Sequence, residues 1–71
     1  MSMGTNLLLA LHRRGMTQTE LAARVGCSQS VISQYISGTR KPSMDKLLRM
    51  VEVLGVTAND LIGGEAAGER G

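Results

Sequence analysis

The stretch from Gln18 to Ser37 constrains the fold most, because its apolar residues follow the spacing of two short amphipathic helices. Ala22 stands on the apolar face of the first helix, where a larger side chain would push the second helix away. Gly26, Cys27 and Ser28 lie between the two helices, and Gly26 permits the sharp turn. The stretch therefore predicts two closely crossing helices joined by a short turn.

The rest of the chain is divided by the same kinds of signal. A glycine closes each helical pattern, and a serine or threonine is placed to cap the segment that follows; Thr17 with Glu20, for example, forms a capping box. No segment alternates convincingly with a period of two, so we predict no strands. We therefore expect an all-α fold, a compact five-helix domain, with helices at about 5–14, 18–25, 29–37, 44–54 and 58–62.

Apolar residues at helical spacing supply one small aliphatic core for a single domain over residues 5–62. Residues 1–4 are expected to be a flexible N-terminus. Residues 63–71, GGEAAGERG, are expected to be a disordered tail because they include no large apolar residue. The expected core residues are Leu7, Leu8, Leu11, Leu21, Ala22, Val25, Val31, Ile32, Tyr35, Ile36, Leu47, Leu48, Val51, Leu54, Leu61 and Ile62.

Composition excludes several classes of protein. One Cys and one His cannot form an internal disulfide or a zinc quartet, so no metal and no cofactor are expected. The longest apolar run, Leu7 to Leu11, is too short to span a membrane, and no signal peptide is evident, so a cytoplasmic location is expected. An enzyme would need a nucleophile beside His12, and no third group to orient such a pair stands out. Residues 1–62 carry seven Lys or Arg against four Asp or Glu, which suits a polyanionic partner.

Together these residues resemble the helix-turn-helix of the phage repressor and Cro family, also called Xre-like. The resemblance covers nearly all of residues 5–62, including the segments TQTELA, SGTRKPS and LLRMVEVLGVTANDLI. It implies a lambda-repressor-like fold in which the second and third helices form the helix-turn-helix. It also implies a sequence-specific DNA-binding transcriptional regulator, a repressor that binds a near-palindromic operator as a homodimer.

The resemblance assigns roles to individual residues. The positions that resemble base-reading residues are Gln29, Ser30, Ser33 and Gln34, and those that resemble phosphate-binding residues are Gln18, Arg40, Lys41 and Ser43. The chemistry agrees, because Gln can bond both N6 and N7 of adenine and Ser can pair with several bases. Residues 29–37 include no Lys or Arg, so the common bidentate contact of arginine with guanine is absent from this helix. The alternative is that these polar residues form an ordinary solvated surface.

The expected partners are double-stranded DNA and a second copy of the chain, in a homodimer that is weak without DNA. Its interface is expected near Val56, Leu61 and Ile62, because the last short helix cannot bury all its apolar residues within one monomer. An antitoxin-like protein-interaction module on the same scaffold, with a toxin as its partner, is the alternative, and no membrane contact is expected. Leu11 and Ile36 occupy positions where many relatives pair Arg with Glu, and an apolar contact between them is expected instead.

Overall fold

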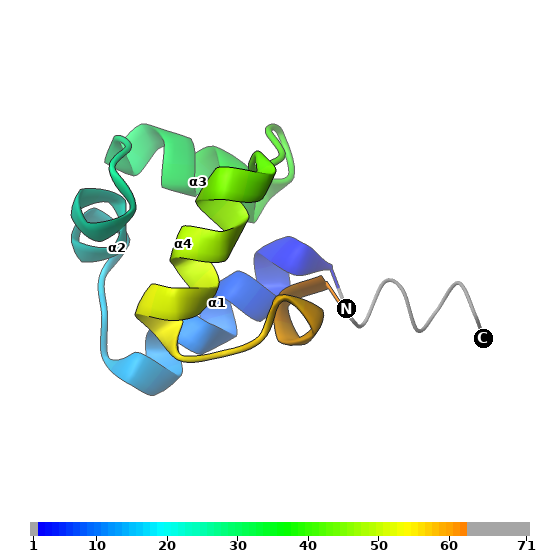
Figure 1. Ribbon diagram of the computed structural model, residues 1–71. Coiled ribbons are helices and arrows are strands. Elements are labelled where there is room, and N and C mark those ends of the chain that lie inside the picture. The colour runs from blue at the N-terminus through cyan, green and yellow to red at the C-terminus, as the bar shows by residue number, and fades with distance from the viewer. Residues whose placement is uncertain (1, 63–71) are drawn as a thin grey trace.

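The structure, a computed structural model, describes residues 2–62. Its helices are α1 (Met3–Arg14), α2 (Gln18–Val25), α3 (Gln29–Ser37) and α4 (Met44–Leu54), and a fifth, short helical segment covers residues 58–62 (Figure 1). Residues 2–62 contain no strand. The prediction of an all-α, five-helix fold is therefore confirmed. The predicted disordered tail, residues 63–71, lies outside the described residues.

Capping residues decide where the helices begin. The Thr17 side chain accepts a hydrogen bond from the Glu20 N–H at 3.0 Å, and the Glu20 carboxylate accepts one from the Thr17 N–H at 2.8 Å. This reciprocal pair is the predicted capping box. At the N-terminus, Ser2 Oγ accepts from the Thr5 N–H at 3.2 Å, so α1 begins at Met3 rather than at residue 5. The described part of segment 1–4 is thus the cap and first turn of a helix.

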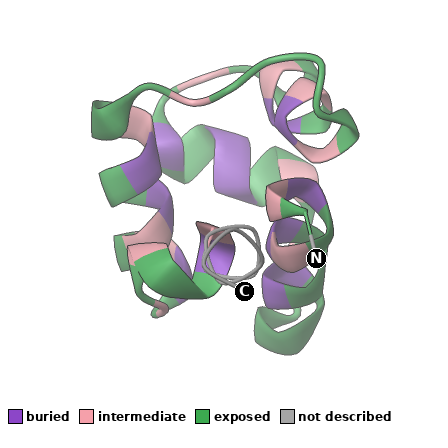
Figure 2. Cartoon of the chain, turned by 90° about the vertical axis from the view of Figure 1, so that its right-hand side faces the viewer, coloured by how far each residue is buried: buried purple, intermediate pink, exposed green. Residues whose placement is uncertain are grey.

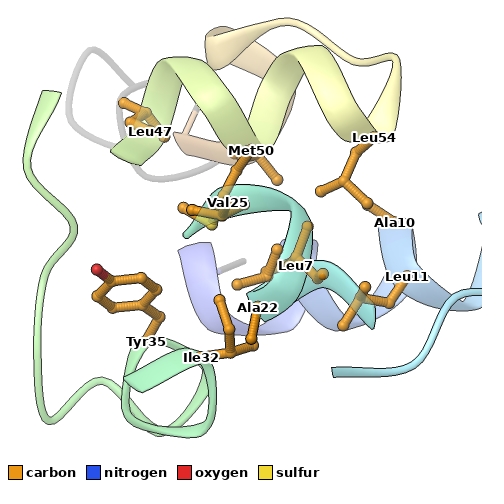
Figure 3. Packing of buried hydrophobic residues seen from close by; sticks show 12 residues of the cluster. Leu7, Ala10, Leu11, Ala22, Val25, Ile32, Tyr35, Leu47, Met50 and Leu54 are labelled. Carbon is orange, nitrogen blue, oxygen red and sulfur yellow. The ribbon is translucent and has the colours of Figure 1, made fainter. Parts of the chain in front are cut away.

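The core forms where all four long helices meet. Figure 2 shows that buried positions lie on the inward faces of the helices, and Figure 3 shows their side chains converging. Ala22 is buried and α2 packs against α3, as the small residue at this position predicted. Leu8 and Leu48 were expected in the core but are about half exposed. The buried hydrophobic residues are Leu7, Ala10, Leu11, Leu21, Ala22, Val25, Ile32, Tyr35, Leu47, Met50, Leu54 and Leu61.

The last short helix is attached to α1. Asn6 Nδ2 donates a hydrogen bond to the Leu61 carbonyl at 2.7 Å, and the Leu61 side chain is only 1% exposed. The prediction that the Leu61 side chain contributes to a dimer interface is therefore wrong, because this side chain is already buried in the core of its own chain. Val56 and Ile62 are half-buried and pack at the edge of the core.

The N-terminal turn of α1 and the C-terminal end of α3 approach each other unusually closely. A Cβ built on Gly4 would lie 2.8 Å from the main-chain carbon of Ile36, and nearer still to its carbonyl oxygen. Only a residue without a side chain therefore fits at Gly4. Leu11 is buried and Ile36 is half-buried, but the expected contact between their side chains stays a prediction.

Candidate nucleic-acid interface

The α3 helix has an apolar face inside the domain and a polar face outside it. Ile32 is fully buried and Tyr35 is 4% exposed, so these two side chains anchor α3 in the core (Figure 3). The opposite side carries the four predicted base-reading residues, of which three are exposed and Gln34 is half-buried. We call these four, Gln29, Ser30, Ser33 and Gln34, the α3 polar face. A helix held in this way can enter a groove without unfolding.

The N-terminal ends of α2 and α3 are joined by a hydrogen bond between side chains. Gln29 Nε2 lies 3.0 Å from Gln18 Oε1. The bond brings a predicted base-reading residue and a predicted phosphate-binding residue together, eleven positions apart in the sequence. Backbone N–H groups at the start of α2 stand beside Gln18, where an anion is favoured. This end of the polar face can therefore contact a base edge and the neighbouring backbone at once.

The nearby Glu20 carboxylate belongs to the α2 cap. Its hydrogen bonds from the Thr17 main chain and side chain hold the pKa of Glu20 below its ordinary value. The carboxylate therefore remains ionised at neutral pH and stabilises the helix start. The cap positions Gln18, which is the first residue of α2.

The loop between α3 and α4 folds back on the other end of the polar face. Arg40 Nε donates to Gln34 Oε1 at 2.8 Å, and the Arg40 N–H donates to the Gln34 carbonyl at 3.3 Å. Lys41 follows Arg40 and is exposed. The structure thus places both predicted phosphate-binding cations of this loop next to the C-terminal end of α3.

Ser43 is the N-cap residue of α4, as the sequence predicted. Its Oγ accepts from the Lys46 N–H at 3.3 Å and caps α4. The hydroxyl hydrogen can still be donated to a phosphate oxygen, because the cap uses only a lone pair.

Lys46 was not singled out from the sequence. Its Nζ lies 3.5 Å from the carbonyl of Gly26, in the turn of the helix-turn-helix. A cation at the C-terminal end of α2 interacts favourably with the helix dipole, so Lys46 helps to hold the turn against α4. Its spacing from the turn along the chain gave no signal of this contact.

The α3 polar face and the loop after α3 present mainly hydrogen-bonding groups. The described residues include no cluster of three or more His, Cys, Asp or Glu that could hold a metal ion. None of the helices described is both long enough and apolar enough to cross a bilayer. Burial raises the pKa of Tyr35, so its hydroxyl stays protonated at neutral pH. The arrangement is suited to recognising a surface of hydrogen-bond donors, acceptors and negative charge.

Comparisons with known proteins agree with this geometry. The helix-turn-helix family model matches residues 9–61. A relative from Sinorhizobium fredii, the uncharacterized HTH-type transcriptional regulator y4dJ, is 34% identical over 59 residues, covering 83% of this chain and 77% of the relative. The putative multi-protein-binding factor 1 of Yarrowia lipolytica is 33% identical over 55 residues, covering 78% of this chain but only 36% of that relative.

A solved structure has the same fold. The P22 c2 repressor protein, in complex with synthetic operator 9T in the presence of Tl+, superposes with a TM-score of 0.85 and 25% sequence identity. The match covers 90% of this chain and 97% of that one, so the predicted lambda-repressor-like fold is confirmed. The chain belongs to the helix-turn-helix family of DNA-binding regulators.

Proposed function

We propose that this helix-turn-helix protein is a sequence-specific transcriptional repressor that binds a near-palindromic operator as a homodimer. The observation that carries the proposal is the contact between Gln18 and Gln29, which joins the N-terminal ends of α2 and α3 beside an exposed polar face. The similarity to a repressor that binds an operator supports it. So does the mild positive charge, which suits a polyanionic partner.

The polar residues then divide into two classes of contact. The α3 polar face enters the major groove and carries the sequence preference, because base edges there differ in their donors and acceptors. The phosphate-binding residues fix the position of the domain on the duplex without reading sequence. These are Gln18, Arg40, Lys41 and Ser43.

A binding titration at several salt concentrations tests these assignments. We expect Gln29→Ala to weaken binding to the selected operator by roughly 1–3 kcal/mol and to relax the preference at one base pair. We expect Lys41→Ala to weaken binding to every duplex alike and to reduce the salt slope by about one. If Gln29→Ala leaves both affinity and preference unchanged, then the N-terminal end of α3 does not read bases.

The dimer follows from the small size of one reading surface. One copy of α3 contacts only a few base pairs, and two copies related by a two-fold axis would contact half-sites about 10 base pairs apart. Val56 and Ile62 are half-buried at the edge of the core and are the remaining candidates for the interface. Their apolar surface is small, so the free dimer should be weak and the operator should bring the copies together. Sedimentation of the complex should give two chains per operator, and one chain on an asymmetric site would contradict the dimer.

A protein-interaction module is the second candidate. Met44 and Leu48 lie one turn apart on α4 and are 66% and 50% exposed, so they form a pair of apolar side chains on the surface that the proposed DNA contacts do not use. The similarity to a relative called a multi-protein-binding factor points the same way. A toxin remains the candidate partner. This function predicts almost no affinity for random duplex at low salt, whereas the repressor predicts binding that weakens steeply as salt rises.

A further inference from the structure

The turn after α3 is held by main-chain hydrogen bonds that do not depend on side chains. The N–H of Gly38 donates to the Tyr35 carbonyl at 3.3 Å, and the N–H of Thr39 donates to the Gln34 carbonyl at 3.0 Å. With the φ of 85° at Gly38, these bonds form a Schellman motif. The N–H of Arg40 donates to the same Gln34 carbonyl at 3.3 Å. The backbone of Arg40 therefore lies beside the last turns of α3 whatever side chain residue 34 carries.

A separate hydrogen bond joins the side chains of Gln34 and Arg40. Arg40 Nε donates to Gln34 Oε1 at 2.8 Å, the length expected when the donor is charged. Gln34 is half-buried on α3, whereas Arg40 is exposed. The bond uses only the Nε–H, so the N–H groups on both Nη atoms of the guanidinium remain as donors. The glutamine thus restrains the guanidinium at its inner nitrogen and leaves the outer nitrogens for a ligand.

Lys41, the neighbouring cation, has no such restraint. It is exposed, and its ammonium group has no hydrogen bond or ion pair with any of residues 2–62. Long basic side chains lose rotamer freedom when a ligand immobilises them, and this loss opposes binding. An arginine that is already restrained loses less of this freedom than an unrestrained lysine. The two cations of the loop therefore differ in how far they are arranged before binding.

We propose that Gln34 is a positioning residue that holds Arg40 for a bidentate contact between its two Nη groups and one backbone phosphate. This inference rests on the proposed DNA-binding function and names the contact that Arg40 makes. A guanidinium can donate two parallel hydrogen bonds to a phosphate, and this contact requires its plane to be oriented. The ammonium of Lys41 is a point charge and has no such plane. Gln34, although neutral, thereby increases the affinity for every duplex, because phosphate contacts carry no sequence information.

Hydrogen exchange in the free protein tests the positioning. In nuclear magnetic resonance spectra, the Nε–H of Arg40 should exchange with water about threefold more slowly than that of exposed Arg13, as a hydrogen bond of modest net strength predicts. Gln34→Met has a side chain of similar length without the amide acceptor, and it should abolish this difference. Gln34→Glu keeps an acceptor and should retain the slow exchange. Equal exchange at Arg40 and Arg13 in the wild-type protein would overturn the inference.

A double-mutant cycle with random duplex at low salt tests the effect on binding. Binding to random duplex depends on backbone contacts alone. Gln34→Met should weaken it by about threefold in the wild-type background, the value of a modest hydrogen bond. In the Arg40→Ala background the same change should weaken it by less than about 1.5-fold, because no guanidinium remains to be positioned. Equal weakening in both backgrounds would contradict a role through Arg40.

Two controls exclude a general effect on the fold or on α3. Gln34→Met leaves the main-chain bonds of the turn in place, so its thermal melt should stay close to that of the wild-type protein. Ser33→Ala changes an exposed neighbour on the α3 polar face that has no bond to a cation, so it should leave the affinity for random duplex unchanged. If Ser33→Ala weakens random-duplex binding as much as Gln34→Met does, the inference is wrong.

These measurements separate the inference from the proposed function. If the wild-type protein binds neither random nor selected duplex, the proposed function and the phosphate contact both fail, whatever the exchange at Arg40. If binding weakens steeply as salt rises but Gln34→Met has the same effect with and without Arg40, DNA binding stands and the positioning role of Gln34 is wrong.

Discussion

Replacement of Gly4 by alanine sets two physical effects against each other. Alanine is favoured over glycine inside a helix by about 1 kcal/mol. In this structure, however, the added Cβ would lie 2.8 Å from the main-chain carbon and 3.2 Å from the Cα of Ile36, closer than the usual 3.5–4.0 Å separation of carbon atoms. Overpacking of this kind costs typically 1–3 kcal/mol. The upper part of that range applies, because a main chain cannot turn aside as a side chain can.

We therefore expect Gly4→Ala to lower the free energy of unfolding by about 1–2 kcal/mol, against a total of about 4–10 kcal/mol for a domain of this size. The melting temperature should fall by roughly 5–15 °C. Because the strain falls on the end of α3, the variant should also bind its operator less tightly. Urea and thermal melts followed by circular dichroism measure the change.

Gly15 provides the control, since it closes the same helix in open surroundings. A Cβ at Gly15 would meet no heavy atom within 4 Å, and its φ of 63° is one that asparagine tolerates. Gly15→Asn should therefore lower the free energy of unfolding by only a few tenths of a kcal/mol, since asparagine also occurs at this position after a helix. Gly4→Asn should lower it by at least as much as Gly4→Ala. A Gly4→Ala protein that melts at or above the wild-type temperature would refute the close packing of α1 on α3.

Two further predictions concern the core and a helix cap. Leu7→Ala should destabilise the domain by about 2–5 kcal/mol because Leu7 is fully buried, whereas the same change at half-exposed Leu8 should cost much less; paired urea melts compare them. The lowered pKa of Glu20 adds stability that is fully present above its ordinary value of 4.5 and is lost as the pH falls through the lowered value. In melts from pH 7 to pH 3, Glu20→Gln should therefore show a smaller loss of the free energy of unfolding than the wild-type protein. If the two proteins lose the same free energy over this range, the Glu20 carboxylate does not contribute to the pH dependence.

Helix ends were predictable because their signals are local. The capping box at Thr17 and Glu20 and the glycine at residue 26 act within one turn of the helices they limit, and α2 begins and ends where they indicate. The start of α1 was missed because Ser2 has no acidic partner three residues later and Gly4 resembles a helix breaker. Gly4 is in fact required by the crossing of α1 and α3, which depends on residues 32 positions apart.

The burial of individual side chains was predicted less well, because the spacing of apolar residues gives the direction of a helix face only approximately. On α4 the buried positions are Leu47, Met50 and Leu54, so the core side is rotated away from the expected Leu48. In the candidate site, likewise, the sequence assigned single residues but not the contacts between them. The resemblance assigned Gln34 and Arg40 separately, but their hydrogen bond depends on how the loop folds back, which no local pattern indicates.

The central claim is that the α3 polar face contacts DNA. The most direct test is a nuclear magnetic resonance titration of the protein with a selected operator duplex, followed at backbone and glutamine side-chain amides. We expect the largest shifts at Gln18, Gln29, Ser30 and Ser33, with little change at exposed Leu8 on α1. Shifts concentrated on α1 or at Met44 and Leu48, with the α3 polar face unchanged, would contradict it.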